Sequence, residues 1–344
     1  MGVKKLSLSK QTTITKIRAI YGKMIKKDEY KNILSCSNIK EFVDLIQNRI
    51  LYKEILEVLD RNNLNIDKVE KFIKNKALLN YARIYKLIKE NKILNHLIRY
   101  FEIDEILRIT TLIEENRTKI YVVDLPTYLA LKCKINIFEF SKIENFEELL
   151  NVLKNTKYEK FLLKNFNEKN GVDFLKFEHM LYKDFFKNLL KTIRDKTKNV
   201  ELYELNRLIK TKIDILNSFY IFREKIIFKT GKEEIEKRVF PFYKNLKKEK
   251  IEKILEAQTA NQMEEDFKKV YSKINEFKLE KIETNLKQKE YDLCKHYLNI
   301  SQNVTTVFYC FFILQKIEVE NLIHIVEGIR YNLKKEEIEN FLII

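Results

Sequence analysis

The sequence contains little glycine and proline and no tryptophan: among 344 residues there are 5 Gly and 2 Pro. So few turn-forming residues exclude an all-β sandwich and disfavour the several glycine loops of a nucleotide-binding α/β enzyme. Hydrophobic residues make up 45% of the chain, which is enough to build a globular core. We therefore expect an all-α fold of long helices joined by short polar connections.

Cysteine and histidine are scarce and scattered, with four of each. No CxxC pair and no paired His spacing occurs, so the sequence suggests neither a disulfide framework nor a zinc site. We expect no metal site and no cofactor, and we expect the cysteines to be reduced, partly buried thiols of a cytoplasmic protein. The cysteines are Cys36, Cys133, Cys294 and Cys310, and the histidines are His96, His179, His296 and His324.

Long apolar runs are also lacking. The longest, residues 304–314 (VTTVFYCFFIL), has about half the length of a bilayer-spanning helix, which needs about 20 residues. We predict a buried helix for this segment. Directly after it, Glu318 and Glu320 could be a catalytic pair, a metal site or the entrance to a helix. Apolar residues at the spacing of one helix face follow them, so we interpret these acids as a helix start. The apolar positions are Val319, Leu322, Ile323, Val326 and Ile329.

The formal charge of +16 is compatible with nucleic acid, an anionic membrane surface or acidic proteins as partners. One alternative hypothesis is therefore a basic helical scaffold for nucleic acid. However, the 50 acids are interspersed with the lysines, which argues against a basic stripe for nucleic acid. Another alternative, a metal-dependent carboxylate enzyme of the helical-bundle type, needs Glu-x-x-His pairs. Glu178 and His179 are adjacent instead, so the spacing fails.

A first internal repeat links an acidic-apolar helix to a tyrosine. Residues 30–56 resemble residues 137–162, and in both a tyrosine, Tyr52 or Tyr158, follows the acidic-apolar helix by about ten residues, or three helical turns. A weaker third copy ends near Tyr271. The amphipathic rings of these tyrosines predict either core packing or contact with a partner.

A second landmark is a helix marked by an apolar residue followed by glutamate, at Glu70, Glu178 and Glu283. These glutamates lie a little over a hundred residues apart, a distance typical of one small domain. Each could line a central cavity or form a local pair with a lysine or arginine.

The third landmark is an acid at Asp104, Asp214 and Glu320, each following a basic or polar segment. We predict a short break before each acid and a helix that starts at it. A catalytic pair would not be expected in three corresponding copies, whereas a helix start would be.

The three landmarks predict three similar helical domains in a pseudo-threefold arrangement with a hollow or groove between them. The N-terminus of the first domain is expected to pack with the last helices of the chain. The predicted domains are residues 1–115, 116–228 and 229–344.

Two terminal motifs carry a family resemblance. Residues 16–30 (KIRAIYGKMIKKDEY) and residues 316–330 (KIEVENLIHIVEGIR) resemble motifs of the AC39 family, which comprises the C subunit of the archaeal and bacterial V/A-type rotary ATPases and its homologue, the d subunit of the eukaryotic V-ATPase. Glu178, in FEHMLYKDFF, also fits a helix of this family. The likeness covers nearly the whole chain, although Ile20 replaces the usual Met and residues 248–281 are divergent.

The resemblance implies an all-α funnel of three domains, seated between the central shaft and the proteolipid ring of the ATPase. Such a subunit is not an enzyme; it transmits torque between ATP turnover and proton or sodium transport. It would be peripheral to the cytoplasmic face of the cell membrane, would not bind nucleic acid, and would be monomeric when isolated. The candidate interface residues are Glu70, Glu178, Glu283, Asp104, Asp214, Glu320, Tyr52, Tyr158 and Tyr271.

Overall fold

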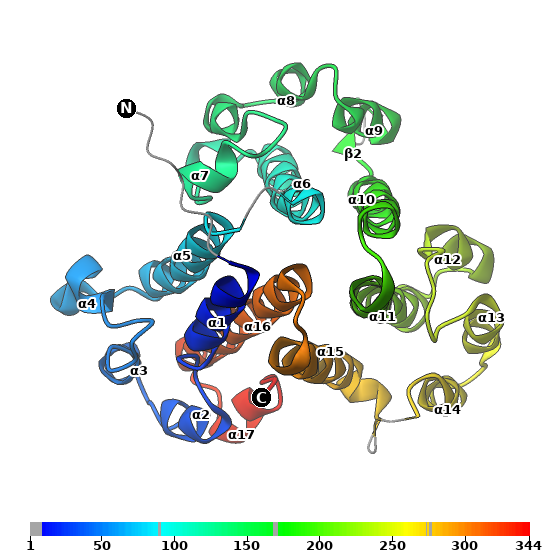
Figure 1. Cartoon of the computed structure of the whole chain (residues 1–344). Helices are drawn as coiled ribbons and strands as arrows, with labels where there is room; N and C mark the ends of the chain where they lie inside the picture. Colours follow the sequence, from blue (N-terminus) through cyan, green and yellow to red (C-terminus); the bar gives the residue numbers. More distant parts are fainter. Residues whose placement is uncertain (1–8, 89–90, 168–170, 273, 275–276) are drawn as a thin grey trace. The chain divides into compact units, whose positions relative to one another are not determined.

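The computed structural model describes residues 9–88, 91–167, 171–272, 274 and 277–344, and within them the chain is predominantly helical (Figure 1). The strands in this part of the chain are the short β1 (Phe166–Asn167) and β2 (Gly171–Val172), which pair antiparallel. The predicted all-α fold is confirmed.

The helical elements follow one another with short connections. In the first part they are α1 (Lys10–Tyr21), α2 (Lys27–Ile33), α3 (Ile39–Ile46), α4 (Ile55–Val58), η1 (Arg61–Asn63), α5 (Ile66–Tyr85), α6 (Lys92–Glu114) and η2 (Thr118–Ile120). The middle part contains α7 (Thr127–Ala130), η3 (Ile137–Lys142), α8 (Phe146–Leu153), α9 (Lys157–Asn165), α10 (Phe174–Lys196), α11 (Asn199–Phe222) and the π-helical turn η4 (Arg223–Ile227). The last part contains α12 (Lys232–Arg238), α13 (Lys248–Glu256), α14 (Ala260–Val270), η5 (Leu279–Lys281), α15 (Ile282–Ile300), α16 (Val304–Arg330) and α17 (Lys335–Glu339).

The short amphipathic helices α3 and α8, which the first repeat predicts, begin with the same side-chain pattern. The Asn38 side chain accepts a hydrogen bond of 3.0 Å from the backbone N–H of Glu41. Asn145 accepts one of 3.0 Å from the backbone N–H of Glu148. An asparagine cap of this kind stabilises a helix by about 1 kcal/mol, so the local sequence fixes where both helices start.

The chain divides into two compact units, each with its own core. The first unit comprises Met1–Lys89, Lys210–Lys232 and Tyr243–Ile344, and the second comprises Glu90–Ile209 and Glu233–Phe242. The division of the sequence into three similar domains stays a prediction.

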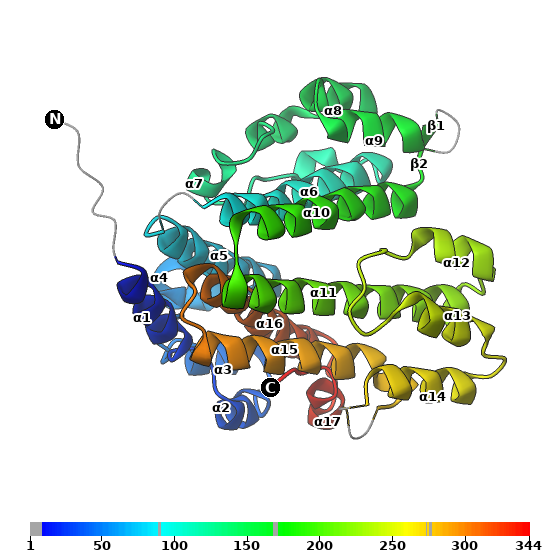
Figure 2. The ribbon, with the colours of Figure 1, turned by 45° about the vertical axis from the view of Figure 1, so that its right-hand side comes forward.

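In the first unit, the 27-residue helix α16 packs against α15, α5 and α1 (Figures 1 and 2). Every side chain from Thr305 to Gln315 is buried, which confirms the buried helix predicted for residues 304–314. Tyr81 of α5 contacts the ring of Phe312 edge-on, with the ring centroids 4.6 Å apart. Aromatic pairs of this geometry add about 0.5–1.5 kcal/mol beyond the area they bury.

The C-terminal segment of the first unit folds back onto the same helix. The Asn321 side chain donates to the carbonyl oxygen of Ile343 at 2.7 Å and accepts from its N–H at 2.9 Å. Gly328 lies under Ile338 of α17, and a Cβ atom at position 328 would overlap the Ile338 side chain. Glycine therefore permits the close approach of α17 to α16.

In the second unit, α6 packs along α10, and α10 also contacts α9 (Figure 2). The Nε2–H group of His96 in α6 donates to the carbonyl oxygen of Phe185 in α10 at 3.1 Å. Burial lowers the pKa of His96 to about 4, so the ring is neutral near pH 7 and serves as a core hydrogen-bond donor.

Three of the long helices run through positions where the sequence predicts breaks. Asp104, Asp214 and Glu320 lie inside α6, α11 and α16, so the prediction that these acids start helices is wrong. Neither glycine nor proline occurs near these positions, and nothing interrupts the backbone hydrogen bonds. The polar residues before each acid were interpreted as a break between two helices. They lie instead on the polar face of one continuous helix.

Candidate interface residues

The three predicted tyrosines lie in the core. Tyr52 is in the turn between α3 and α4, Tyr158 is in the first turn of α9, and Tyr271 caps the end of α14. Their exposed fractions are 3%, 2% and 1%. This burial favours the core-packing alternative over direct contact with a partner.

In the first unit, Tyr52 binds a buried carboxylate on α16. Its hydroxyl donates to Glu318 Oε1 at 2.6 Å, and the backbone N–H of Ile25 donates to Glu318 Oε2 at 2.8 Å. Glu318 is 3% exposed. Burial raises the pKa of Glu318 to about 7, although the hydrogen bonds from Tyr52 and Ile25 act in the opposite direction. The carboxylate therefore joins α16 to two segments of the N-terminal region.

An equivalent arrangement occurs in the second unit on α6. The hydroxyl of Tyr158 donates to Glu102 Oε2 at 2.7 Å, and the backbone N–H of Lys134 donates to Glu102 Oε1. Glu102 is fully buried. We call this arrangement a clamp: a buried carboxylate on a long helix that accepts a hydrogen bond from at least one backbone N–H group of another segment.

A third clamp, on α11, uses more backbone groups. The carboxylate of Asp214, which is 1% exposed, accepts from the N–H groups of Lys244, Asn245 and Leu246 at 3.1, 2.7 and 3.3 Å. Burial raises the pKa of Asp214, and these three N–H groups partly offset the rise. The hydroxyl of Tyr271 donates to the backbone carbonyl oxygen of Asp214 at 3.1 Å. A tyrosine is therefore present in this clamp too, but its hydroxyl donates to a backbone carbonyl of the helix and not to the carboxylate.

The hydrogen bonds correct the register of the third landmark. By its bonding, Asp214 corresponds to Glu102 and Glu318. The sequence comparison paired it with Asp104 and Glu320 instead, each two residues further along its helix. Glu102 is therefore a structural residue that the sequence analysis missed.

A signal for the Glu318 clamp was present in the sequence. Leu314 and Leu322, four residues before and after Glu318, are both buried, and so is Ile325, seven residues after it. An acid in the middle of an apolar helix face must find hydrogen-bond donors inside the protein. The interpretation of Glu318 and Glu320 as a helix start did not take this buried position of Glu318 into account.

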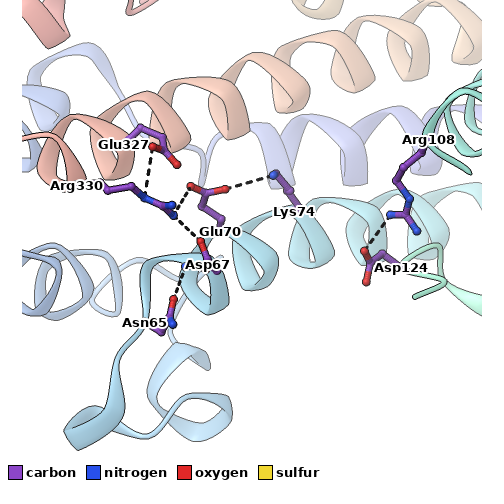
Figure 3. Close-up of polar contacts among 8 residues, drawn as sticks. All are labelled: Asn65, Asp67, Glu70, Lys74, Arg108, Asp124, Glu327 and Arg330. Atoms are coloured by element: carbon purple, nitrogen blue, oxygen red, sulfur yellow. Dashed lines mark hydrogen bonds and ion pairs between the residues drawn. The ribbon is translucent and has the colours of Figure 1, made fainter. Parts of the chain in front are cut away.

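Glu70 belongs to a charged network between α5 and α16 (Figure 3). The Arg330 guanidinium lies 2.5 Å from Asp67, 3.7 Å from Glu70 and 3.4 Å from Glu327. Lys74 lies 3.4 Å from Glu70 on the same helix. Burial and the neighbouring Glu327 carboxyl raise the pKa of Glu70. Glu70 is thus paired within its own unit, in line with the local-pairing alternative.

Glu283 and Glu320 share one lysine. The ammonium group of Lys287 on α15 lies 2.8 Å from Glu283, one turn earlier, and 3.4 Å from Glu320 on α16. The Glu283 side chain is 68% exposed and the Glu320 side chain 32% exposed. Both acids therefore remain accessible to water, and the Glu320–Lys287 pair joins α16 to α15.

In the second unit, Asp104 accepts a hydrogen bond of 3.0 Å from the hydroxyl of Tyr182 on α10. Burial and the Asp104 carboxylate raise the pKa of Tyr182. Glu178 lies one turn before Tyr182 on the same helix and is half-buried. Asp104 and Glu178 therefore lie on the two long helices that form the core of this unit.

Within the described part of the chain, no three His, Cys, Asp or Glu side chains are grouped so that they could hold a metal ion. None of the described helices combines the length and apolar character that crossing a membrane requires.

The amino-acid sequence was compared with curated proteins and with models of protein families. No curated protein matches it. A family model described as "ATP synthase (C/AC39) subunit" matches residues 13–341, which include both terminal motifs that carry the resemblance. The chain therefore belongs to the ATP synthase (C/AC39) family, whose members are subunits of V/A-type ATPases.

Proposed function

We propose that this chain is the non-catalytic central-stalk subunit of a V/A-type rotary ATPase and couples the rotating shaft to the proteolipid ring. The observation that carries the proposal is the family match over residues 13–341. In this role the chain would bind the shaft subunits and the ring, and would lie peripherally at the cytoplasmic face of the membrane. It would transmit torque for ATP-linked proton or sodium transport without cofactor or nucleic acid.

The mechanical properties of the core support this role. A coupling element must transmit torque without yielding, and close-packed helices have low compressibility. The clamps at Glu102, Asp214 and Glu318 each fix a long helix to a neighbouring segment through buried hydrogen bonds. Helices α6 and α11 contain no glycine or proline, and α16 contains glycine only near its end. The residues that commonly kink a helix are therefore absent from most of their length.

We also propose that the chain consists of three helical repeats with pseudo-threefold symmetry, at residues 1–115, 116–228 and 229–344. In support, each clamp carboxylate lies near the end of one proposed repeat and bonds with a segment of another. Glu318, in the last repeat, bonds with Tyr52 and Ile25 in the first. The N-terminal segment would thereby close the series.

The candidate residues divide by their exposure. We propose that the partly exposed acids Glu70, Glu178, Glu283, Asp104 and Glu320 contribute to contacts with the shaft or the ring. The buried residues of the set act inside the chain and position the long helices.

The direct test is affinity purification of the tagged chain from gently solubilised native membranes, followed by mass spectrometry. We expect the proteolipid ring and the nucleotide-binding head subunits to copurify, with or without nuclease treatment. Recovery of nuclease-sensitive ribonucleoprotein without those subunits would contradict the proposal and favour a nucleic-acid scaffold.

A second experiment tests torque transmission. In membranes that carry the Tyr52→Phe variant, the Glu318 clamp lacks its hydroxyl donor, so we expect fewer ions transported per ATP hydrolysed. The control is Tyr331→Phe, because Tyr331 is 69% exposed in the same unit. An unchanged ratio in the Tyr52→Phe membranes would show that this clamp has no part in coupling.

A further inference from the structure

The end of α11 displays consecutive apolar side chains on the protein surface. Ile226, Ile227 and Phe228 are 37%, 59% and 57% exposed. We call residues 223–232, which include the π-helical turn η4, the tip. Single exposed apolar residues are common, but a contiguous exposed patch indicates a contact surface.

The tip is an ordered structure. The backbone N–H of Phe228 donates to the carbonyl oxygen of Arg223 at 3.1 Å, and that of Thr230 donates to the carbonyl oxygen of Glu224 at 2.9 Å. The Thr230 hydroxyl also donates to the Glu224 carboxylate at 2.7 Å, and Glu224 is 2% exposed. A π-helical turn and a buried acid thus hold the apolar side chains outward. Turns of this kind often occur at functional sites.

The tip itself carries positive exposed charge, although its last residue, Lys232, pairs with Glu256 at 2.7 Å and the acids Glu233 and Glu234 follow in the sequence. Its single acid, Glu224, is buried, and its basic residues are Arg223, Lys225, Lys229 and Lys232. Lys225 donates to the carbonyl oxygen of Ile254 at 3.1 Å and thereby ties the tip to the end of α13. Arg223 and Lys229 are exposed on either side of the apolar residues.

We propose that the tip is an anchor for an anionic bilayer surface, in which Ile227 and Phe228 enter the interfacial region while Arg223 and Lys229 bind lipid phosphates. Apolar side chains flanked by cations are typical of interfacial anchors, and the basic stems can extend towards the head groups. The anchor goes beyond the proposed coupling function, because it involves lipid and neither the shaft nor the ring.

The geometry favours a bilayer over a protein partner. The apolar side chains come from consecutive residues of one turn, not from the i, i+3, i+4 positions by which an amphipathic helix docks in a groove. A protein would need a pocket shaped to such a turn, whereas the interfacial region of a bilayer adapts to it. Negative lipid head groups complement the exposed charges of Arg223 and Lys229.

Insertion can be measured directly because the chain contains no tryptophan. The Phe228→Trp variant of the full chain would carry a single tryptophan, at the tip, whose emission can be excited selectively over that of the 18 tyrosines. With vesicles of equal parts phosphatidylcholine and phosphatidylglycerol, we expect its emission to shift to the blue and to be quenched by brominated acyl chains. The matched control is Phe341→Trp, since Phe341 is 54% exposed in the same unit, and we expect no shift there.

Cosedimentation with the same vesicles gives the contribution of each side chain. We expect the Ile227→Ser/Phe228→Ser variant to lower the partition coefficient by about tenfold or more. Lys229→Glu should lower it by about tenfold, and raising the salt concentration should weaken binding. The control Ile50→Ser/Val58→Ser removes side chains that are 61% and 66% exposed elsewhere in the unit, and should bind like the unmodified chain.

Absence of a blue shift for Phe228→Trp, an equal shift for Phe341→Trp, or vesicle binding that survives both tip variants would overturn the proposal. These measurements contain no other subunit. A negative result therefore leaves the copurification test of the coupling function untouched.

Discussion

Helix α16 is joined to the N-terminal region at its middle and at its end, in two different ways. In the middle, the buried Glu318 accepts hydrogen bonds from Tyr52 and Ile25. At the end, the Arg330 side chain is 34% exposed and lies near several acids. In the core each lost partner leaves a desolvated polar group, whereas water replaces a lost partner at the surface. Removal of a single hydrogen-bonding group at the middle of α16 should therefore lower stability strongly, while removal of a charged group at its end should have a small effect.

The largest effect is expected for Glu318→Ala. This change leaves the Tyr52 hydroxyl and the Ile25 N–H without an acceptor in the core, so the free energy of unfolding should fall by about 3–4 kcal/mol. Chemical denaturation measures it. The control is Glu320→Ala, two residues further along, whose partly exposed ion pair should contribute less than about 1 kcal/mol. Equal losses would remove the distinction between buried and exposed acids.

The pH dependence of stability should separate the two sites further. Burial raises the pKa of Glu318 from 4.5 to about 7, so between these pH values the folded chain binds more protons than the unfolded chain. Stability therefore falls as pH rises through this range, by about 3 kcal/mol at most, and levels off above it. The measurement is the difference in unfolding free energy between the unmodified chain and Glu318→Gln.

For this difference we expect a slope between about pH 5 and pH 7. A flat difference for Glu318→Gln over this range would mean that the folded and unfolded chains bind the same number of protons there, so that the pKa of Glu318 is not raised by folding.

A smaller effect is expected where α17 packs on the end of α16. The Cβ atom introduced by Gly328→Ala would overlap Ile338, and overpacking of this kind costs about 1–3 kcal/mol. A double-mutant cycle with Ile338→Ala measures the overlap itself. The double variant should be less destabilised than the sum of the single variants. If the losses of the two single variants add up in the double variant, the overlap between positions 328 and 338 does not contribute to the destabilisation.

The smallest effect is expected for Arg330→Ala. Its ion pairs with Asp67 and Glu327 are partly exposed, so the loss should be the smallest of these and should shrink as salt is added. Arg117→Ala, which removes the exposed pair with Glu115, provides the matched control. A loss as large as that of Glu318→Ala would contradict the contrast between the end and the middle of the helix.

The sequence alone predicts the helical class, the buried segment at residues 304–314 and, through residues 16–30 and 316–330, the family. It does not predict that α16 continues through Glu320. An acid in a first helical turn gains only about 0.3–1 kcal/mol, and the same pattern arises when a continuous helix turns its polar face to water. Local composition cannot separate these cases.

The clamps show the corresponding limit for the candidate residues. The repeat of Tyr52 and Tyr158 was visible in the sequence, but their acceptors were not. Tyr52 binds an acid 266 residues away, and only tertiary packing brings the two together. Exposure of Phe228 was equally hidden, since three consecutive apolar residues in a sequence normally indicate core.

The sequence separation of the clamp in α16 also has a consequence for biosynthesis. Ile25 and Glu318 lie 293 residues apart, whereas Tyr158 and Glu102 lie 56 apart. At about 5–20 residues per second, a ribosome needs about 15–60 s between the first pair. The clamp of the second unit can close while translation continues. The helices α1 to α3 must wait for α16 to emerge, with their apolar faces open to chaperones until then.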